Sequence, residues 1–386
     1  MRYGYAVFLV GWLLAVPVRA QLLPKKLLIY YGYPSYINKT YDAGRAAAEY
    51  ARYDYVVLGD GYQFDSHPDY AAMVSLLNSA TTAGVRFFGY VDLGVTNGTQ
   101  NRTPAELRDR IDRWKRAGID GIFFDDFGYD YGVSRQRQND AVAYAHAQGL
   151  PVVANGWNPD DVLGRQTNAA YNPTGVSPVL GATDFYLLES NLIAEGQFQD
   201  PAFWQSRADR TRAYQRSLGI RILSITTNSE PNANIYDAAR FSYAWYGAFL
   251  YGHEATGWGE YAFAASTVEC PFRERPTVGT PGTRFLTEPA RSGSESVRFT
   301  NAGRIRLDTT THTGDFTPCS RCQANASGNW SNPALWSCGR VPFPCDPVHI
   351  SAGQRITIDS PAQAQTLRLD GKIQYSIPAG QLQLYP

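Results

Sequence analysis

Short apolar runs recur along the first two thirds of the chain at a spacing of about 30 residues. Several alternate little between apolar and polar positions, which is typical of parallel strands buried on both faces. The runs are Leu27–Tyr31, Tyr55–Leu58, Val85–Val91, Gly121–Phe124, Pro151–Ala154, Phe185–Leu188, Ile220–Ile225 and Ala255–Trp258. Eight runs alternating with helical segments predict an α/β fold, a (β/α)8 TIM barrel. A doubly wound sheet has the same local pattern, but eight strands with a polar group after nearly every one favour closure.

The segments between the runs carry helix-boundary signals. Thr103-Pro104-Ala105-Glu106 has the form of a capping box with proline at the first helical position, where free amide donors need partners. Four glycines stand shortly before an apolar run. We expect each to end a helix there, because the end of a helix favours a residue in the left-handed conformation. They are Gly84, Gly118, Gly149 and Gly219.

The character of the sequence changes after Glu260. Residues 271–315 are rich in proline, glycine, threonine and arginine, which predicts that the barrel's last helix gives way to a few β-strands or a linker. Residues 316–386 hold a cysteine cluster followed by β-type runs at 348–350, 355–358, 366–369 and 381–384. The domains we expect are a barrel over 21–265, a barrel-associated β extension or linker over 266–315, and a small disulfide-stapled β-rich accessory module over 316–386.

The first 20 residues resemble a secretory signal peptide. Arg2 gives a basic start, Tyr5–Val16 an apolar core, and Val18-Arg19-Ala20 a small-x-small cleavage site. The apolar core is shorter than the roughly 20 residues of a transmembrane helix, which favours cleavage near Ala20 over a membrane anchor. We expect residues 1–20 to be removed, no membrane span in the mature chain, and a secreted or cell-surface location.

The chain has five cysteines, and four of them fall within 27 residues near the C-terminus. They are Cys270, Cys319, Cys322, Cys338 and Cys345. In an exported chain this clustering predicts two disulfides among the last four, with three possible connectivities. Cys319-x-x-Cys322 also has the spacing of zinc ligands, but the second pair is spaced differently and no histidine is suitably placed. We expect Cys270 to stay unpaired or to bond across the domain boundary.

Composition narrows the candidate functions only slightly. Lys+Arg and Asp+Glu are equal at 35 each, so charge gives no argument for nucleic acid or an anionic membrane. Aromatic residues make up 13% of the chain, a level that suits either a sugar-binding cleft or a β-rich barrel. We expect a monomer with no nucleic-acid partner.

Polar side chains follow nearly every predicted strand, at the end where TIM barrels place their catalytic groups. In strand order they are Tyr30, Tyr31 and Tyr33, Asp60, Asp92, Asp125 and Asp126, Asn155 with Trp157, Glu189 with Asn191, Thr226 to Asn228, and Trp258 with Glu260. The set lacks a Ser-His-Asp triad, a glycine-rich phosphate loop and a histidine cluster. We therefore expect chemistry without a cofactor or a metal.

Carboxylates of this kind point to the hydrolysis of glycosidic bonds. One carboxyl protonates the leaving oxygen, and another carboxylate attacks the sugar or activates water. Asp125 and Glu189 can face each other across the barrel mouth. In an extended strand Asp125 lies on the same face as Phe123, and Asp126 lies on the same face as Phe124. The sequence leaves open which of these two faces points into the barrel. The predicted catalytic residues are Asp125, Glu189 and Asp126, and the predicted substrate-binding residues are Tyr30, Asp60, Asp92, Asn155, Trp157 and Trp258.

The stretch Gly118-Ile-Asp-Gly-Ile-Phe-Phe-Asp125-Asp126 resembles a pattern of endo-α-1,4-polygalactosaminidases, spherulin-4-like glycoside hydrolases and related bacterial glycoside hydrolases. Further similar stretches are Tyr53–Asp60, Phe88–Gly94, Leu150–Asn155, Tyr186–Ser190 and Arg298–Gly303. The resemblance covers roughly residues 25–310. It implies that Asp125 is the essential acid of strand 4, Asn155 the amide of strand 5 and Glu189 the acid of strand 6. Many relatives have Thr, Asn or Glu where this chain has Asp126.

The run Ala326–Pro342 resembles an accessory module of secreted bacterial surface proteins. The leading hypothesis is therefore an exported glycoside hydrolase that cleaves a polysaccharide or oligosaccharide, with an amino-sugar polymer as candidate substrate. One alternative is a barrel that binds carbohydrate without cleaving it and carries a surface-adhesion module. Another is a metal-dependent lyase or aldolase that uses the acidic ring for Mg²⁺.

Overall fold

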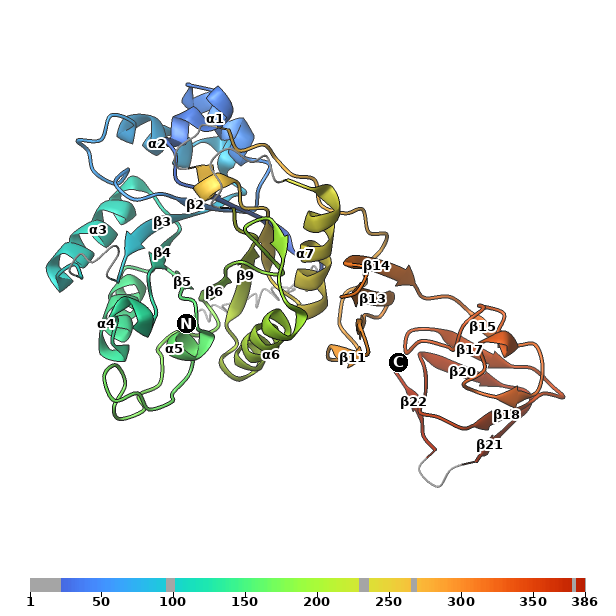
Figure 1. Ribbon diagram of the computed structural model, residues 1–386. Coiled ribbons are helices and arrows are strands. Elements are labelled where there is room, and N and C mark those ends of the chain that lie inside the picture. Colours follow the sequence, from blue (N-terminus) through green and yellow to red (C-terminus); the bar gives the residue numbers. More distant parts are fainter. Residues whose placement is uncertain (1–21, 95–100, 229–235, 265–268, 377–379, 386) are drawn as a thin grey trace, which may run out of the picture.

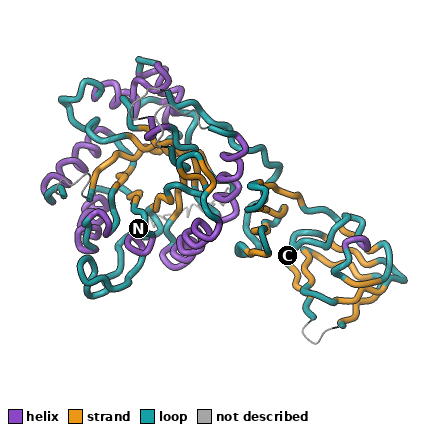
Figure 2. Tube along the Cα trace, viewed as in Figure 1, coloured by secondary structure: helices purple, strands orange, loops and turns teal. Residues whose placement is uncertain are grey.

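The computed structural model describes residues 22–94, 101–228, 236–264, 269–376 and 380–385. Its N-terminal part is a closed barrel of eight parallel strands, ringed by helices (Figures 1 and 2). The barrel strands are β1 (Lys25–Tyr30), β2 (Tyr55–Leu58), β3 (Arg86–Asp92), β4 (Gly121–Asp125), β5 (Val152–Asn155), β6 (Phe185–Leu188), β9 (Arg221–Ile225) and β10 (Ala255–Gly257). All eight predicted runs therefore form barrel strands, and the predicted fold class is confirmed.

Alternate residues of each strand fill the inside of the barrel. Leu27, Val57, Phe123 and Val153 belong to one interior apolar cluster, whereas their chain neighbours pack outward against the helices. The strands follow one another around the barrel in chain order, so β1 stands opposite β5. This alternation decides which strand-end side chains reach the mouth.

The helices between the strands bury one face on the barrel. They are α1 (Ala43–Tyr50), α2 (Tyr70–Leu77), α3 (Pro104–Ala117), α4 (Arg135–Ala147), α5 (Pro159–Leu163), α6 (Pro201–Leu218) and α7 (Ala238–Tyr251). Short 3-10 turns lie at η1 (Pro34–Lys39), η2 (Ala80–Thr82), η3 (Tyr129–Tyr131), η4 (Tyr261–Ala264) and η5 (Pro333–Leu335). Two two-residue strands, β7 (Ile193–Ala194) and β8 (Gln197–Phe198), pair within the loop between β6 and α6.

The predicted capping box and most of the predicted glycine ends are confirmed. The side chains of Thr103 and Glu106 cap α3 reciprocally, and Gly118 ends it at φ 95°. Gly149 and Gly219 also have positive φ angles, 73° and 71°. The prediction for Gly84 is wrong, because the chain reaches β3 through η2, which ends in the right-handed residue Ala83.

After the barrel the chain changes from helices to β-strands, one of the two alternatives expected for this segment. After β10 the described residues hold only the turn η4, and the chain then forms a four-stranded antiparallel sheet. Its strands are β11 (Ala290–Ser292), β12 (Glu295–Phe299), β13 (Gly303–Asp308) and β14 (Thr313–Pro318). Ile305 and Leu307 of β13 pack into one cluster with Trp245 and Phe249 of α7. The sheet thus covers the outer face of a helix that is apolar on nearly all sides.

The C-terminal residues wind into a short stack of parallel strands beyond this sheet (Figure 1). Its strands are β15 (Cys322–Ala324), β16 (Gly328–Asn329), β17 (Pro347–Ile350), β18 (Arg355–Ile358), β19 (Ala362–Ala364), β20 (Thr366–Leu369), β21 (Lys372–Tyr375) and β22 (Leu382–Leu384). Each turn of chain lays its strands on those of the turn before, which gives the parallel sheets β15-β17-β20, β16-β18-β21 and β19-β22. Its core is small, with Trp330 and Trp336 packed edge to face.

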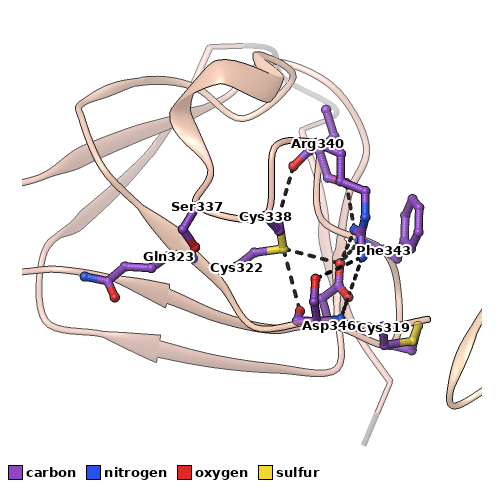
Figure 3. Close-up of polar contacts among 11 residues, drawn as sticks. Cys319, Cys322, Gln323, Ser337, Cys338, Arg340, Phe343 and Asp346 are labelled. Carbon is purple, nitrogen blue, oxygen red and sulfur yellow. Dashed lines mark hydrogen bonds and ion pairs between the residues drawn. A yellow bond between two sulfur atoms is a disulfide. The ribbon is translucent and has the colours of Figure 1, made fainter. Parts of the chain in front are cut away.

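Two disulfides staple this module, as predicted, and they select one of the three open connectivities. They join Cys319 to Cys345 and Cys322 to Cys338, so these four sulfurs are not zinc ligands. The fully buried Asp346 lies beside them and accepts hydrogen bonds from the backbone of Ser320 and Phe343 and from the Arg340 guanidinium (Figure 3). Cys270 is buried and unpaired.

Two further predictions concern membranes and export. Within the described ranges, no helix is both long and apolar enough to cross a bilayer. The predicted signal peptide lies outside the described residues.

Substitution of Gly89 in β3 tests how closely the barrel packs against α3. An added Cβ would lie 2.3 Å from the fully buried ring of Trp114, so Gly89→Ala should lower the free energy of unfolding by about 1–3 kcal/mol. Gly84→Ala, where nothing lies within 4 Å, should change it by less than about 0.5 kcal/mol. Urea denaturation of both variants measures this difference, and equal stabilities would contradict the packing described.

Candidate active site

The alternation of β4 settles which of two adjacent aspartates faces the barrel interior. Phe123 lies in the interior cluster, whereas Ile122 and Phe124 pack outward. Asp125 is two residues beyond Phe123, so its side chain enters the mouth. Asp126 follows with φ 52°, beyond the end of the extended strand.

Asn155, at the end of β5, connects the two predicted catalytic acids. Its side-chain nitrogen Nδ2 donates to Oδ1 of Asp125 at 2.8 Å and to Oε2 of Glu189 at 3.0 Å. The two oxygens therefore lie no more than 5.8 Å apart, the sum of these distances. The structure thus brings Asp125, Asn155 and Glu189 together.

Two interior tyrosines complete the surroundings of Asp125. Tyr90 of β3 donates its hydroxyl to the Asp125 carboxyl. The Tyr90 ring meets that of Tyr31 edge to face, with the ring centroids 5.4 Å apart. Burial and the nearby acids raise the pKa of both phenols well above the usual range. Both hydroxyls therefore remain protonated donors at neutral pH.

Burial changes the ionisation of the paired acids. Burial first, and then the charge of Glu189, raises the pKa of Asp125 to about 6 against the opposing hydrogen bonds from Tyr90, Asp126 and Asn155. The pKa of Glu189 is also raised by burial, while Asn155 and the charge of Arg207 oppose the rise. Two carboxyls this close do not both ionise freely, so the pair retains a proton to higher pH than isolated acids would.

The main chain after Glu189 is fixed by side chains from neighbouring loops. Ser190 has φ 54°, and its hydroxyl shares a 2.7 Å hydrogen bond with Thr227. Arg207 of α6 donates to the carbonyl oxygens of Glu189 and Trp157, both at 3.2 Å. The Arg207 guanidinium also stacks 4.2 Å from the centroid of the Trp157 ring, which is 46% exposed at the rim.

Asp126 is held close to the pair by a tight backbone approach. Its amide donates to the Asp125 carboxyl at 2.9 Å, and a Cβ on Gly94 would lie 2.4 Å from its carbonyl oxygen. Its charge contributes to the raised pKa of Glu189. Asp126 is therefore an electrostatic neighbour of the pair, although it follows the strand instead of ending it.

Two other predicted acids, Asp60 and Asp92, have partners among the residues that follow β2 and β3. Asp60 pairs with Arg102 at 3.3 Å and with Arg110, and it accepts a hydrogen bond from Gln63. Asp92, level with Asp125 on the neighbouring strand, accepts from the amide of Gly94 at 3.0 Å. These contacts order the loops after β2 and β3.

The structure does not bring Tyr30 and Trp258 into the mouth. Each has the outward parity of its strand, so Tyr30 packs edge to face on Tyr50 of α1, and Trp258 packs on Phe241 of α7. Both are buried. The tyrosine that does reach the mouth is Tyr31.

Sequence reasoning left three residues of the site without a role. Tyr31 and Tyr90 could have been found, because each has the parity of interior positions such as Leu27 and Phe88. Arg207 gave no signal, since an arginine in the middle of a helix is usually a solvated side chain.

A metal-binding site requires several ligand atoms within reach of one ion. Among the residues that the structure describes, one group of three ligand atoms lies within mutual reach, formed by Cys319, Cys345 and Asp346. Two of those atoms are joined in a disulfide. The described acids of the mouth form no such group.

No protein-family model matches the chain, and no curated protein sequence does. Solved structures match it over about three fifths of its length. The glycoside hydrolase domain of PelA from Pseudomonas aeruginosa is 17% identical with a TM-score of 0.37, covering 61% of this chain and 94% of that domain. AmyP in complex with maltose is 13% identical with a TM-score of 0.41, covering 60% and 66%.

A dihydropteroate synthase from Stenotrophomonas maltophilia is similar to the same extent, 12% identical with a TM-score of 0.36, covering 64% of this chain and 92% of that one. At this level of similarity the matches assign no function, which has to be argued from the site.

The raised pKa of Asp125 generates a stability prediction. Between about pH 4 and pH 6 the folded protein keeps a proton that the unfolded chain has released, so stability falls as pH rises through this window. Asp125→Asn should therefore raise the free energy of unfolding relative to the parent above pH 6, by about 1–3 kcal/mol, and leave it unchanged near pH 4.

Thermal or urea unfolding across this pH range measures the effect. Asp65→Asn is the control, since its side chain is 82% exposed and should show no such dependence. A difference between Asp125→Asn and the parent that is the same at pH 4 and pH 8 would contradict the buried, proton-retaining carboxyl.

Proposed function

We propose that the protein is a secreted glycoside hydrolase that cleaves a polysaccharide with Asp125 and Glu189. The observation that carries this proposal is the Asn155 amide, which donates to both carboxyls and holds their nearest oxygens no more than 5.8 Å apart. Retaining glycosidases place their two carboxyls at about 5–5.5 Å, and inverting ones at about 6.5–9.5 Å. The spacing therefore favours a double-displacement reaction with retained configuration.

The different surroundings of the two acids suggest their roles. Asp125, whose pKa is raised to about 6, is the proton donor to the leaving oxygen. The charge of Glu189 raises the pKa of Asp125, so Glu189 is the acid that ionises first, and it serves as the nucleophile. Its oxygen attacks the anomeric carbon as the glycosidic bond breaks and Asp125 protonates the departing alcohol. Water, deprotonated by Asp125, then releases the sugar and restores both groups.

The substrate class that we propose is a polymer of amino sugars. Asp126 and Asp92 lie beside the paired acids, and carboxylates bind ammonium groups through strong charge-assisted hydrogen bonds. The resemblance to polygalactosaminidases agrees with this choice. The protein is proposed to act as an exported monomer, with the stapled module as an accessory to the barrel.

The assignment of roles can be tested with glycosides of different leaving groups. Asp125→Asn should lower kcat/KM by about 10³-fold or more on a natural oligosaccharide, yet keep much of the first step on an activated aryl glycoside that needs no proton. Glu189→Gln should lose activity on both. Asp65→Asn, which neutralises an acid whose side chain is 82% exposed, is the control. Parent-like cleavage by both site variants would refute the assignment.

The pH dependence of activity should follow the paired acids. Because Asp125 has to be protonated, kcat/KM should fall as pH rises above about 6. The hydrogen bond from Asn155 lowers the pKa of Asp125, so Asn155→Ala should move this alkaline limb to higher pH. Initial rates on one oligosaccharide from pH 4 to pH 9 measure both profiles, and a limb that is unmoved in Asn155→Ala would count against Asp125 as the acid.

The substrate class can be tested with one polymer in two states. Partly deacetylated α-1,4-linked galactosamine polymer should be cleaved faster than the fully acetylated form, because the free ammonium groups meet the additional carboxylates. Reducing-end release measures the rates, and equal rates would reject a site for cationic sugars. Retention of the polymer without any cleavage would favour the alternative, a carbohydrate-binding barrel.

A further inference from the structure

Three exposed tyrosines lie on the loop between β1 and α1. Tyr33, Tyr36 and Tyr41 are 39%, 38% and 60% exposed. Their rings form a continuous series, with centroids 5.1 Å apart between Tyr33 and Tyr36 and 4.9 Å apart between Tyr36 and Tyr41. Exposed aromatic rings gathered in one place are unusual on a soluble surface and mark a binding surface more often than isolated ones do.

The series is held in place by the loop after β2. The Tyr33 ring packs against His67 and Tyr62, at centroid distances of 4.9 and 5.9 Å. Below the rings, both the amide and the hydroxyl of Ser35 donate to the buried carboxyl of Asp69. A surface fixed in this way loses little conformational entropy when it binds a ligand.

The tyrosine series is continuous with the candidate active site. Tyr33 follows Tyr31 by two residues, and the Tyr62 hydroxyl donates to the Tyr31 carbonyl at 2.8 Å. Tyr31 lies within electrostatic reach of Asp125 and Glu189. Because β1 stands opposite β5 in the barrel, this series lies across the mouth from the exposed ring of Trp157.

The chemistry of the rings matches a sugar chain. Each exposed tyrosine offers an apolar face to the C–H side of a pyranose ring, and none of the three hydroxyls makes a hydrogen bond to a residue that the structure describes. We propose that Tyr33, Tyr36 and Tyr41 form a glycan-binding platform that holds a polymer chain outside the bond-cleaving centre. This inference rests on the proposed function, because that function determines that the bound polymer runs toward the bond-cleaving centre. Binding at the platform can nevertheless be measured without cleavage.

The platform is tested with the double substitution Tyr36→Ala/Tyr41→Ala, which removes two exposed rings and leaves Tyr33 packed on His67. For partly deacetylated α-1,4-linked galactosamine polymer we expect KM to rise roughly tenfold, as lost stacking of two rings predicts. For the tetrasaccharide of the same sugar, which we expect to occupy the centre alone, kcat and KM should change less than about twofold. Tyr375→Ala is the matched control, since that ring is 55% exposed on β21 of the C-terminal module.

A second measurement separates this inference from the proposed function. In the Asp125→Asn background, affinity electrophoresis in gels containing the polymer should show retardation that the double substitution abolishes and Tyr375→Ala preserves. An unchanged polymer KM together with unchanged retardation would overturn the platform while leaving the hydrolase in place. Equal losses on the polymer and the tetrasaccharide would also overturn it, because the rings would then act at the centre. If neither the polymer nor the tetrasaccharide is cleaved, the proposed hydrolase activity is refuted. The retardation experiment still tests the platform in that case, and a parent protein that the polymer does not retard would overturn the platform.

Discussion

One side-chain amide holds two acids together at the mouth of this barrel, and much of the local structure depends on that contact. Asn155 donates to Asp125 and Glu189 from β5, which lies between β4 and β6. Each of the three residues is two positions beyond an interior residue of its own strand, Phe123, Val153 or Leu187. Neighbouring strands and equal parity therefore suffice to converge three side chains, and the shared donor reduces the repulsion that two buried carboxylates would otherwise feel.

The surroundings of the pair keep it buried and its geometry fixed. Tyr90 donates from the adjacent strand, while Asp126 and Ser190, directly after the two acids, adopt positive φ angles that turn the chain away from the mouth. Backbone conformations of this kind cost about 1–3 kcal/mol in non-glycine residues and persist where the surrounding contacts enforce them, often at functional sites. The Arg207 contacts with the carbonyls of Glu189 and Trp157 supply part of that enforcement on the β6 side.

Hydrophobic periodicity was sufficient to predict the barrel, because every interior strand is a dense apolar run with its own polar end. It could not predict which face of β4 is inside, since Phe123 and Phe124 are equally apolar, and it therefore left Asp125 and Asp126 unresolved. Because the inward face of β1 was also unknown from the sequence, Tyr30 was predicted to bind substrate, whereas the structure places Tyr31 in the mouth. The disulfide pairing and the β-sheet that covers α7 depend on contacts between distant segments, such as Phe316 with Phe249, which local patterns do not encode.

The proposed hydrolysis requires that the two carboxyls, whose nearest oxygens lie no more than 5.8 Å apart, act as a nucleophile and an acid on one glycosidic bond. The most direct measurement is the anomeric configuration of the product first released, followed by proton NMR as an amino-sugar oligosaccharide is cleaved. We expect the configuration of the cleaved bond to be retained, with the other anomer arising only later by mutarotation. A first product of inverted configuration would contradict it.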